Sequence, residues 1–240
     1  RQMCIRDSGI RAPGYIRKND GSLTENPASY QNYLNKIESM TKSEEVDIML
    51  MSMTSAERLI TNKIFENNSV TPAVRLNDTS CTWGMIRNGE YSKEESRPFA
   101  TAQLKHAINF VDLGLYSITF NKNVDRDVNM LNLYRDFRIQ AEEIQMRHFL
   151  EVFNSSVINL SIKEMGEYVN DCILKTLSGQ LSSERPLFLI IQYNGPKAME
   201  ELASYDPSGL VVGILGGSQG TSRDCFESVS YTHLTLPTKA

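Results

Sequence analysis

The sequence is poor in the residues that build disulfide frameworks and metal centres. Its 240 residues include four cysteines and three histidines, and no two cysteines have the Cys-x-x-Cys spacing. Disulfide-rich domains and zinc sites need such residues in larger, regularly spaced groups. We therefore expect neither a disulfide framework nor a metal site, and we expect no cofactor.

Long apolar runs and an excess of positive charge are also missing. No run approaches the ~20 apolar residues that cross a membrane, and no signal peptide is visible. The formal net charge is −4, whereas a surface that binds nucleic acid is basic. We expect a cytoplasmic protein with no membrane partner and no nucleic-acid partner, and the sequence leaves a homo-oligomer open.

Two segments near the ends of the chain have complementary coding. Met3-Cys4-Ile5-Arg6-Asp7 can be encoded by a nucleotide string whose reverse complement reads Val-Ser-Tyr-Thr-His, the sequence of residues 229–233. The string also resembles a transposase adapter used to build sequencing libraries. We therefore expect residues 1–8 and 229–240 to be adapter translations. The remaining 9–228 are expected to form one domain that is truncated at both ends.

Six short apolar runs alternate with segments of helical periodicity. The predicted strands are Val46–Met53, Pro72–Asn77, Val111–Asn121, His148–Asn154, Leu187–Asn194 and Leu210–Leu215. The predicted helices are Ala28–Met40, Ser55–Glu66, Val124–Met146, Ile162–Leu177 and Pro196–Ser204. Thr54 is expected to cap the second helix, with Glu57 at the capping-box spacing, and Pro196 suits a first helical position.

Strands that alternate with helices predict an α/β fold with a parallel sheet. Strand starts at intervals of roughly 25–40 residues fit a (β/α)₈ TIM barrel that lacks a strand at each end. An open doubly wound parallel sheet is the alternative. The long polar segment 78–98 is expected to form a loop over the barrel mouth.

A glycine-rich turn follows the last predicted strand. A strand, a glycine turn and a helix start in that order leave backbone N–H groups at a positive dipole end, which suits a phosphate. The turn lacks the lysine of a P-loop and the glycine spacing of a Rossmann fingerprint, so a tight turn that binds nothing is the alternative. The predicted phosphate-binding residues are Gly216, Gly217, Ser218, Gly220 and Thr221.

Three stretches carry a resemblance to a known family. Ser-Glu-Arg-Pro-Leu-Phe-Leu-Ile-Ile-Gln-Tyr-Asn-Gly-Pro-Lys-Ala-Met-Glu-Glu-Leu (183–202), Val-Val-Gly-Ile-Leu-Gly-Gly-Ser (211–218) and Phe-Leu-Glu-Val-Phe-Asn (149–154) resemble the class I aldolase superfamily. They are most similar to aldolase-like barrels near the bacterial fructose-bisphosphate and tagatose-bisphosphate aldolases. The resemblance implies an aldolase-type barrel over 9–228, a ligand the size of a phosphosugar, and a Schiff-base lysine on the sixth strand.

Two acidic residues are candidates for catalysis. Glu151 is a lone carboxylate in an otherwise apolar strand, and unpaired burial of a charge costs several kcal/mol. It resembles the fifth-strand glutamate that handles protons in tagatose-type aldolases, and an ion pair with Arg75 is the alternative. Asp78 directly follows a predicted strand, so it could act as a base or hold a substrate hydroxyl, or merely form an Asx-turn.

The sixth predicted strand, however, contains no lysine. Schiff-base chemistry needs an amine in an apolar pocket or near a cation. Lys197 starts the next helix and is the best candidate, either as the amine or as a phosphate contact; a solvated lysine is the alternative, and Lys122 is a weaker candidate. The predicted substrate-binding residues, which end or follow strands, are Asn77, Asn121, Gln192 and Asn194.

Three functions remain open at this point. The first is an aldolase-type lyase that acts on a phosphorylated sugar or keto acid, with Glu151, Lys197 and Asp78 as catalytic residues. The second is a barrel that binds a phosphosugar without turning it over, which the missing strand lysine favours. The third is an isomerase or epimerase that uses Glu151 as a base without an imine.

Overall fold

The computed structural model describes residues 3–5, 13–17, 23–27, 29–81 and 89–215. The chain divides into two compact units. The first unit consists of 1–76 with 101–115, and the second of 77–100 with 116–240. Both units combine parallel strands with helices, so the predicted α/β class with a parallel sheet is confirmed.

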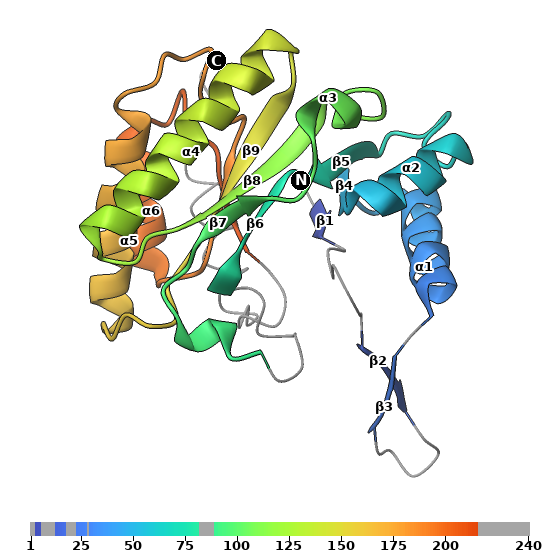
Figure 1. The fold of residues 1–240 in the computed structure, drawn as a ribbon, viewed down its shortest axis with the longest axis horizontal. Helices are drawn as coiled ribbons and strands as arrows, with labels where there is room; N and C mark the ends of the chain where they lie inside the picture. Colours follow the sequence, from blue (N-terminus) through green and yellow to red (C-terminus); the bar gives the residue numbers. More distant parts are fainter. Residues whose placement is uncertain (1–2, 6–12, 18–22, 28, 82–88, 216–240) are drawn as a thin grey trace. The chain divides into compact units, whose positions relative to one another are not determined.

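In the first unit, parallel strands follow one another in chain order. The order is β1-β4-β5-β8, and neighbouring strands in this order are parallel. Its elements are β1 (Met3–Ile5), the antiparallel pair β2 (Pro13–Arg17) and β3 (Leu23–Pro27), α1 (Tyr30–Ser43), β4 (Ile48–Met51), α2 (Met53–Thr61), β5 (Thr71–Arg75), α3 (Leu104–Ala107) and the start of β8 (Leu113–Thr119) (Figure 1).

Helix α2 starts at a residue other than the expected one. Ser52 is the N-cap, and its hydroxyl accepts a hydrogen bond from the backbone N–H of Ser55. The predicted cap, Thr54, lies inside the helix, so that prediction is wrong. Serine and threonine both commonly cap helices. Ser52 takes the capping position because strand β4 ends at Met51 and the helix already starts at Met53.

Met3–Ile5 forms a strand although we expected residues 1–8 to lie outside the fold. Met3 is opposite Ile48, and Ile5 is opposite Leu50, in a parallel ladder with β4. An apolar tripeptide can satisfy the hydrogen bonds of an open strand edge whatever its coding origin. The expectation that this segment is an adapter translation stays a prediction.

In the second unit, the strands again follow chain order, here β8-β9-β10-β11. Glu151 of β9 is opposite Ile190 of β10, which is opposite Gly213 of β11. The elements are β6 (Asn77–Thr79), the short 3₁₀ helix η2 (Tyr91–Lys93), β7 (Pro98–Ala100), the end of β8, α4 (Val124–Glu143), β9 (Arg147–Phe153), α5 (Ile162–Leu177), β10 (Leu189–Ile191), α6 (Pro196–Tyr205) and β11 (Val212–Ile214).

The helices of the second unit begin where local chemistry predicts. Ser161 and Glu164 form a reciprocal capping box at the start of α5. Pro196 occupies the first turn of α6, as expected, after Gly195 with φ of 95°. Helix α5 packs on α6, and α4 packs on β9 (Figure 1). None of the helices in the described part of the chain is long and apolar enough to cross a membrane.

The two faces of β8 and β9 have different neighbours. Tyr116 of β8 packs on the ring of Phe137 from α4, with ring centroids 4.4 Å apart. His148 of β9 contacts the same helix through Tyr134. Because side chains alternate along a strand, Ser117 and Glu151 lie on the opposite face, which also carries the stacked rings of Phe149 and Phe188. This inner face contains the candidate site.

All six predicted strands and all five predicted helices are present, within a few residues at their ends. The described parts of the predicted loop 78–98, residues 78–81 and 89–98, contain regular structure that we did not expect. They include the end of β6, the 3₁₀ helix η2 and the start of β7, which pairs antiparallel with β6.

Candidate functional site

Glu151 lies in the middle of β9 and is buried, with 1% of its surface exposed. The hydroxyl of Ser117 on β8 donates a hydrogen bond to Glu151 Oε2 at 2.8 Å. Ser117 is itself fully buried. A buried carboxylate needs such donors because it has lost its contacts with water. The alternative pairing of Glu151 with Arg75 stays a prediction.

The side chain of Asn77 holds the backbone of Ser117 at both of its hydrogen-bonding groups. Asn77 Nδ2 donates to the Ser117 carbonyl at 2.8 Å, and Asn77 Oδ1 accepts from the Ser117 N–H at 2.6 Å. Both residues are buried. The amide therefore acts as a piece of β-strand backbone, and this structural use differs from the substrate binding that we predicted for it.

Asn121 makes the same kind of double contact one step further along the chain. Its Oδ1 accepts from the backbone N–H of Ser96 at 2.7 Å, and its Nδ2 donates to the Ser96 carbonyl at 3.0 Å. Two residues before Asn121, at the end of β8, the Thr119 hydroxyl lies 3.4 Å from Cys81 Sγ. These contacts join the segment 77–100 to the end of β8.

The ends of β9 and β10 are joined by amides. The side chains of Asn154 and Asn194 exchange two hydrogen bonds, of 2.7 and 3.2 Å. Gln192 Oε1 accepts from the backbone N–H of Asn154. The predicted substrate residues Gln192 and Asn194 thus both follow β10 and contact the same residue, Asn154, directly after β9.

Asp78 lies on β6, immediately after Asn77. Its Oδ1 accepts a hydrogen bond from the backbone N–H of Thr79 at 2.9 Å, and the residue is half-buried. This is a short local contact of the kind that we gave as the alternative to catalysis. Its role as a base or a hydroxyl ligand stays a prediction.

Lys197 lies on the first turn of α6 and is exposed. Every lysine in the described ranges is exposed, Lys122 included. A Schiff-base lysine needs an apolar pocket or a neighbouring cation, so the described residues supply no buried amine. The predicted phosphate-binding residues Gly216, Gly217, Ser218, Gly220 and Thr221 lie outside the described residues.

His148, on the same strand as Glu151, contacts the other side of the sheet. Its Nε2 lies 2.9 Å from the hydroxyl of Tyr134. Burial, and next the positive charge of Arg138, lower the pKa of His148 to about 4. An imidazole that is neutral and faces α4 cannot share a proton with Glu151 across the strand.

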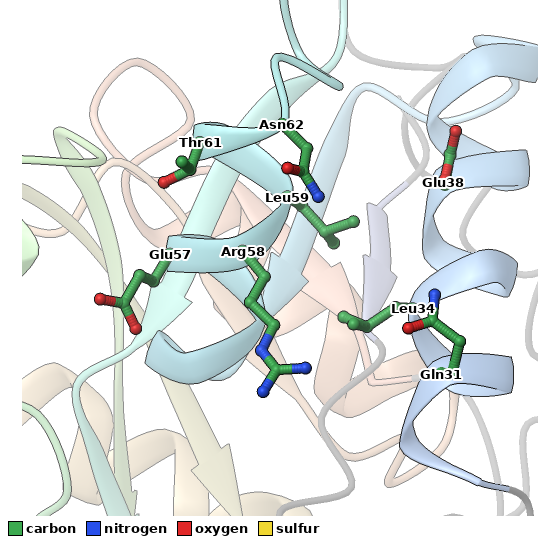
Figure 2. Close-up of a pocket in the computed structure, with 8 residues that line it drawn as sticks. All are labelled: Gln31, Leu34, Glu38, Glu57, Arg58, Leu59, Thr61 and Asn62. Carbon is green, nitrogen blue, oxygen red and sulfur yellow. The ribbon is translucent and has the colours of Figure 1, made fainter.

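An open groove of about 400 Å³ lies on the surface of the first unit, between α1 and α2 (Figure 2). Leu34 and Leu59 form its apolar part, and the Arg58 guanidinium lies over the Tyr30 ring, 4.9 Å from the centroid. Its remaining lining is polar and mostly helical surface: Gln31, Glu38, Glu57, Thr61 and Asn62. None of the predicted site residues lines it.

Sequence reasoning missed Ser117 and Asn154. Both had a signal, because Ser117 and Thr119 are small hydroxyl residues two apart in an otherwise apolar run, and an asparagine ends each of four successive predicted strands. What the sequence could not supply is the partner of each side chain across the sheet.

The geometry defines a class of protein: an α/β protein with parallel strands. On the inner face of its sheet, the buried carboxylate of Glu151 accepts a hydrogen bond from Ser117. Within the described ranges, no group of three or more potential metal ligands occurs. No protein-family model matches the chain, and no curated protein matches it.

Proposed function

We propose that the chain is part of an aldolase-type barrel enzyme that acts on a phosphorylated sugar or keto acid by proton transfer at Glu151. The single observation that carries the proposal is the Ser117–Glu151 hydrogen bond of 2.8 Å between two buried side chains. Burying a carboxylate in a protein core costs free energy of desolvation, which an entirely apolar strand avoids. Buried ionisable groups concentrate at functional sites.

The order of the strands supports the barrel over the alternative sheet. In each unit, the neighbours in the sheet follow the chain order without reversal. A doubly wound sheet reverses its order at a switch point, whereas a barrel adds each strand next to the one before it. Reaction sites of barrels lie at the C-terminal ends of the strands, the end to which Asn121, Asn154 and Asn194 belong.

Glu151 could serve both proton transfers of an aldol cleavage. As a base, it takes the proton from the hydroxyl on the carbon β to the carbonyl. The bond between the α and β carbons then breaks, the β carbon becomes an aldehyde, and the electron pair passes to the carbonyl to give an enolate. Where a lysine amine has first condensed with the carbonyl and released water, the electron pair gives an enamine instead. The proton returns to the α carbon, so that the carboxylate is regenerated. In this proposal Asp78, Gln192 and Asn194 orient hydroxyls, Asn77 and Asn121 hold the backbone beside the site, and the glycine-rich segment 216–221 holds the phosphate.

An isomerase or epimerase is the second candidate, and the exposure of every described lysine favours it. In such a reaction Glu151 removes a proton from the carbon next to the carbonyl and returns it to the neighbouring carbon or to the opposite face. This chemistry needs no imine. Lys197 would then contact the phosphate from the start of α6. A cytoplasmic location suits either reaction.

Solvent-deuterium exchange into dihydroxyacetone phosphate tests the shared step, with the full chain and proton NMR as the readout. We expect exchange with the unaltered chain and a loss of about 100-fold or more in Glu151→Gln. Equal exchange in both proteins, or no exchange with any ketose phosphate, overturns the proposal.

Two further measurements separate the candidates. Borohydride reduction with a ketose bisphosphate traps an imine as a stable lysine adduct, which identifies the lyase that acts through a Schiff base. Exchange without an adduct and with conversion of ketose to aldose identifies the isomerase. Calorimetry that detects binding of the phosphosugar without any exchange identifies a protein that only binds its ligand.

A further inference from the structure

We infer that Ser117 is a positioning residue for Glu151, and that Asn77 holds Ser117 in place for this task. The inference rests on the proposed function. It links three buried residues: the Asn77 amide holds the backbone N–H and carbonyl of Ser117 at 2.6 and 2.8 Å, and the Ser117 hydroxyl donates to the Glu151 carboxylate at 2.8 Å.

The carboxylate needs an external support because its own strand does not fix its side chain. A glutamate has three rotatable side-chain bonds, and a catalytic group must hold its geometry to within about 0.5 Å. A hydroxyl that donates to one carboxylate oxygen removes rotation about the last of these bonds. Hydrogen bonds to charged acceptors are also shorter and stronger than neutral ones.

The hydroxyl in turn needs a fixed backbone. Arg75 of β5 and Leu115 of β8 are opposite each other in a parallel ladder. Asn77 lies two residues after Arg75, and Ser117 lies two residues after Leu115. At this point the backbone of Asn77 pairs with Ala100 of β7 instead. The Asn77 side chain supplies the missing donor and acceptor to Ser117. The end of β8 is therefore held where the proposed chemistry occurs.

The arrangement differs from ordinary core packing in its choice of residues. At a position that is fully buried in a strand, an apolar residue of similar size avoids the desolvation of a hydroxyl. Ser117 is fully buried, as is the neighbouring polar position Thr119, which is 1% exposed. The hydroxyl of Ser117 is aimed at the one carboxylate of β9.

Ser117→Ala tests the inference in the exchange assay described above. We expect kcat/KM to fall by about tenfold to a hundredfold, mainly through kcat, because the carboxylate has lost the donor that holds its geometry. Ser117→Thr keeps the hydroxyl and should restore kcat. A merely structural role predicts an unchanged kcat in Ser117→Ala and no rescue.

Ser55→Ala is the matched control. Ser55 is also fully buried, and its hydroxyl lies 3.2 Å from that of Tyr30 and 3.1 Å from that of Ser52. Its removal should lower the free energy of unfolding about as much as Ser117→Ala does, without changing kcat. If Ser55→Ala and Ser117→Ala lower kcat alike, the inference is wrong.

A readout that is independent of turnover keeps the inference separate from the proposed function. Carbon NMR of chain labelled at glutamate carboxyl carbons, with the Glu151 signal assigned from Glu151→Gln, reports the environment of the carboxylate directly. We expect the chemical shift of this signal to change in Ser117→Ala, which lacks the hydroxyl donor, and to return in Ser117→Thr. An unchanged signal overturns the inference even if the enzyme is active, whereas a changed signal in a protein without exchange activity overturns only the proposed function.

Discussion

The two faces of β9 carry one buried ionisable side chain each, and the protein treats them in opposite ways. On the face toward α4, His148 contacts aromatic rings and the Tyr134 hydroxyl, and its pKa is lowered to about 4. On the inner face, Glu151 receives a hydroxyl donor from Ser117. The first environment favours the neutral form of its side chain, and the second supplies a hydrogen-bond donor to a carboxylate. Two buried ionisable groups on one strand can therefore have very different surroundings.

The aromatic face should dominate stability, and the inner face should dominate activity. Tyr134 is almost fully buried and contacts both Tyr116 and Phe137. Tyr134→Ala should lower the free energy of unfolding by about 3–5 kcal/mol, as measured by urea denaturation. Tyr205→Ala, at a position where 61% of the side chain is exposed, should change it by less than about 0.5 kcal/mol. Equal effects of the two substitutions would break the comparison.

Acid should destabilise the protein through the same face. The unfolded pKa of a histidine is 6.5, and that of folded His148 is about 4, so the unfolded chain binds more protons in this window. The contribution of neutral His148 to the free energy of unfolding is fully present above about pH 6.5. It is lost as the pH drops toward 4, by about 3 kcal/mol at most. His148→Gln should remove this loss. His106→Gln, at an exposed position, should leave it in place.

The inner face should respond to its amide support. Asn77→Ala leaves the buried N–H and carbonyl of Ser117 without this partner, and we expect a loss of about 2 kcal/mol in the free energy of unfolding. Asn109→Ala removes an exposed side chain that contacts only the carbonyl of Lys105, at 3.4 Å, and should cost less than about 0.5 kcal/mol. A loss in Asn77→Ala no larger than in the control would contradict the role of Asn77 as backbone.

The smallest expected effect compares two hydroxyl–carboxylate contacts. Ser161 donates to Glu164 Oε2 at 2.6 Å on the exposed start of α5, as Ser117 does to Glu151 inside the protein. The hydrogen bonds from the hydroxyl and the backbone N–H of Ser161 hold the pKa of Glu164 below its usual value. Ser161→Ala should cost about 1 kcal/mol through loss of the cap, with helix content followed by circular dichroism. Ser178→Ala, at the other end of α5, should cost less, and neither should alter the exchange reaction.

Much of the fold could be predicted because the strands are apolar and separated by helical periodicity. Ile162–Leu177 was predicted with its observed limits, and Pro196 was placed correctly at the start of α6. The pair β6–β7 was missed because Asn77–Thr79 and Pro98–Ala100 are short and polar or proline-containing, and their pairing depends on contacts across about twenty residues of chain.

The candidate site could be predicted only in part. Glu151 was recognised because a single carboxylate interrupts an apolar strand. Asn77, Asn121 and Asn194 were recognised by their place at strand ends, but their partners Ser117, Ser96 and Asn154 could not be read from the sequence. Whether an amide meets a ligand or a backbone is decided by how neighbouring strands align, which periodicity does not encode.

The amide of Asn77 also has a consequence for how this protein could be remodelled. The Asn77 side chain gives the backbone of Ser117 the hydrogen bonds that a neighbouring strand would otherwise supply. The chain can therefore leave the β5–β8 ladder at this point, form the β6–β7 pair, and return about twenty residues later. Asn77 shares the attachment of this segment with two further contacts, those of Asn121 with Ser96 and of Thr119 with Cys81. We therefore expect a longer or shorter insert to be tolerated only where it leaves Asn77, Cys81 and Ser96 in place.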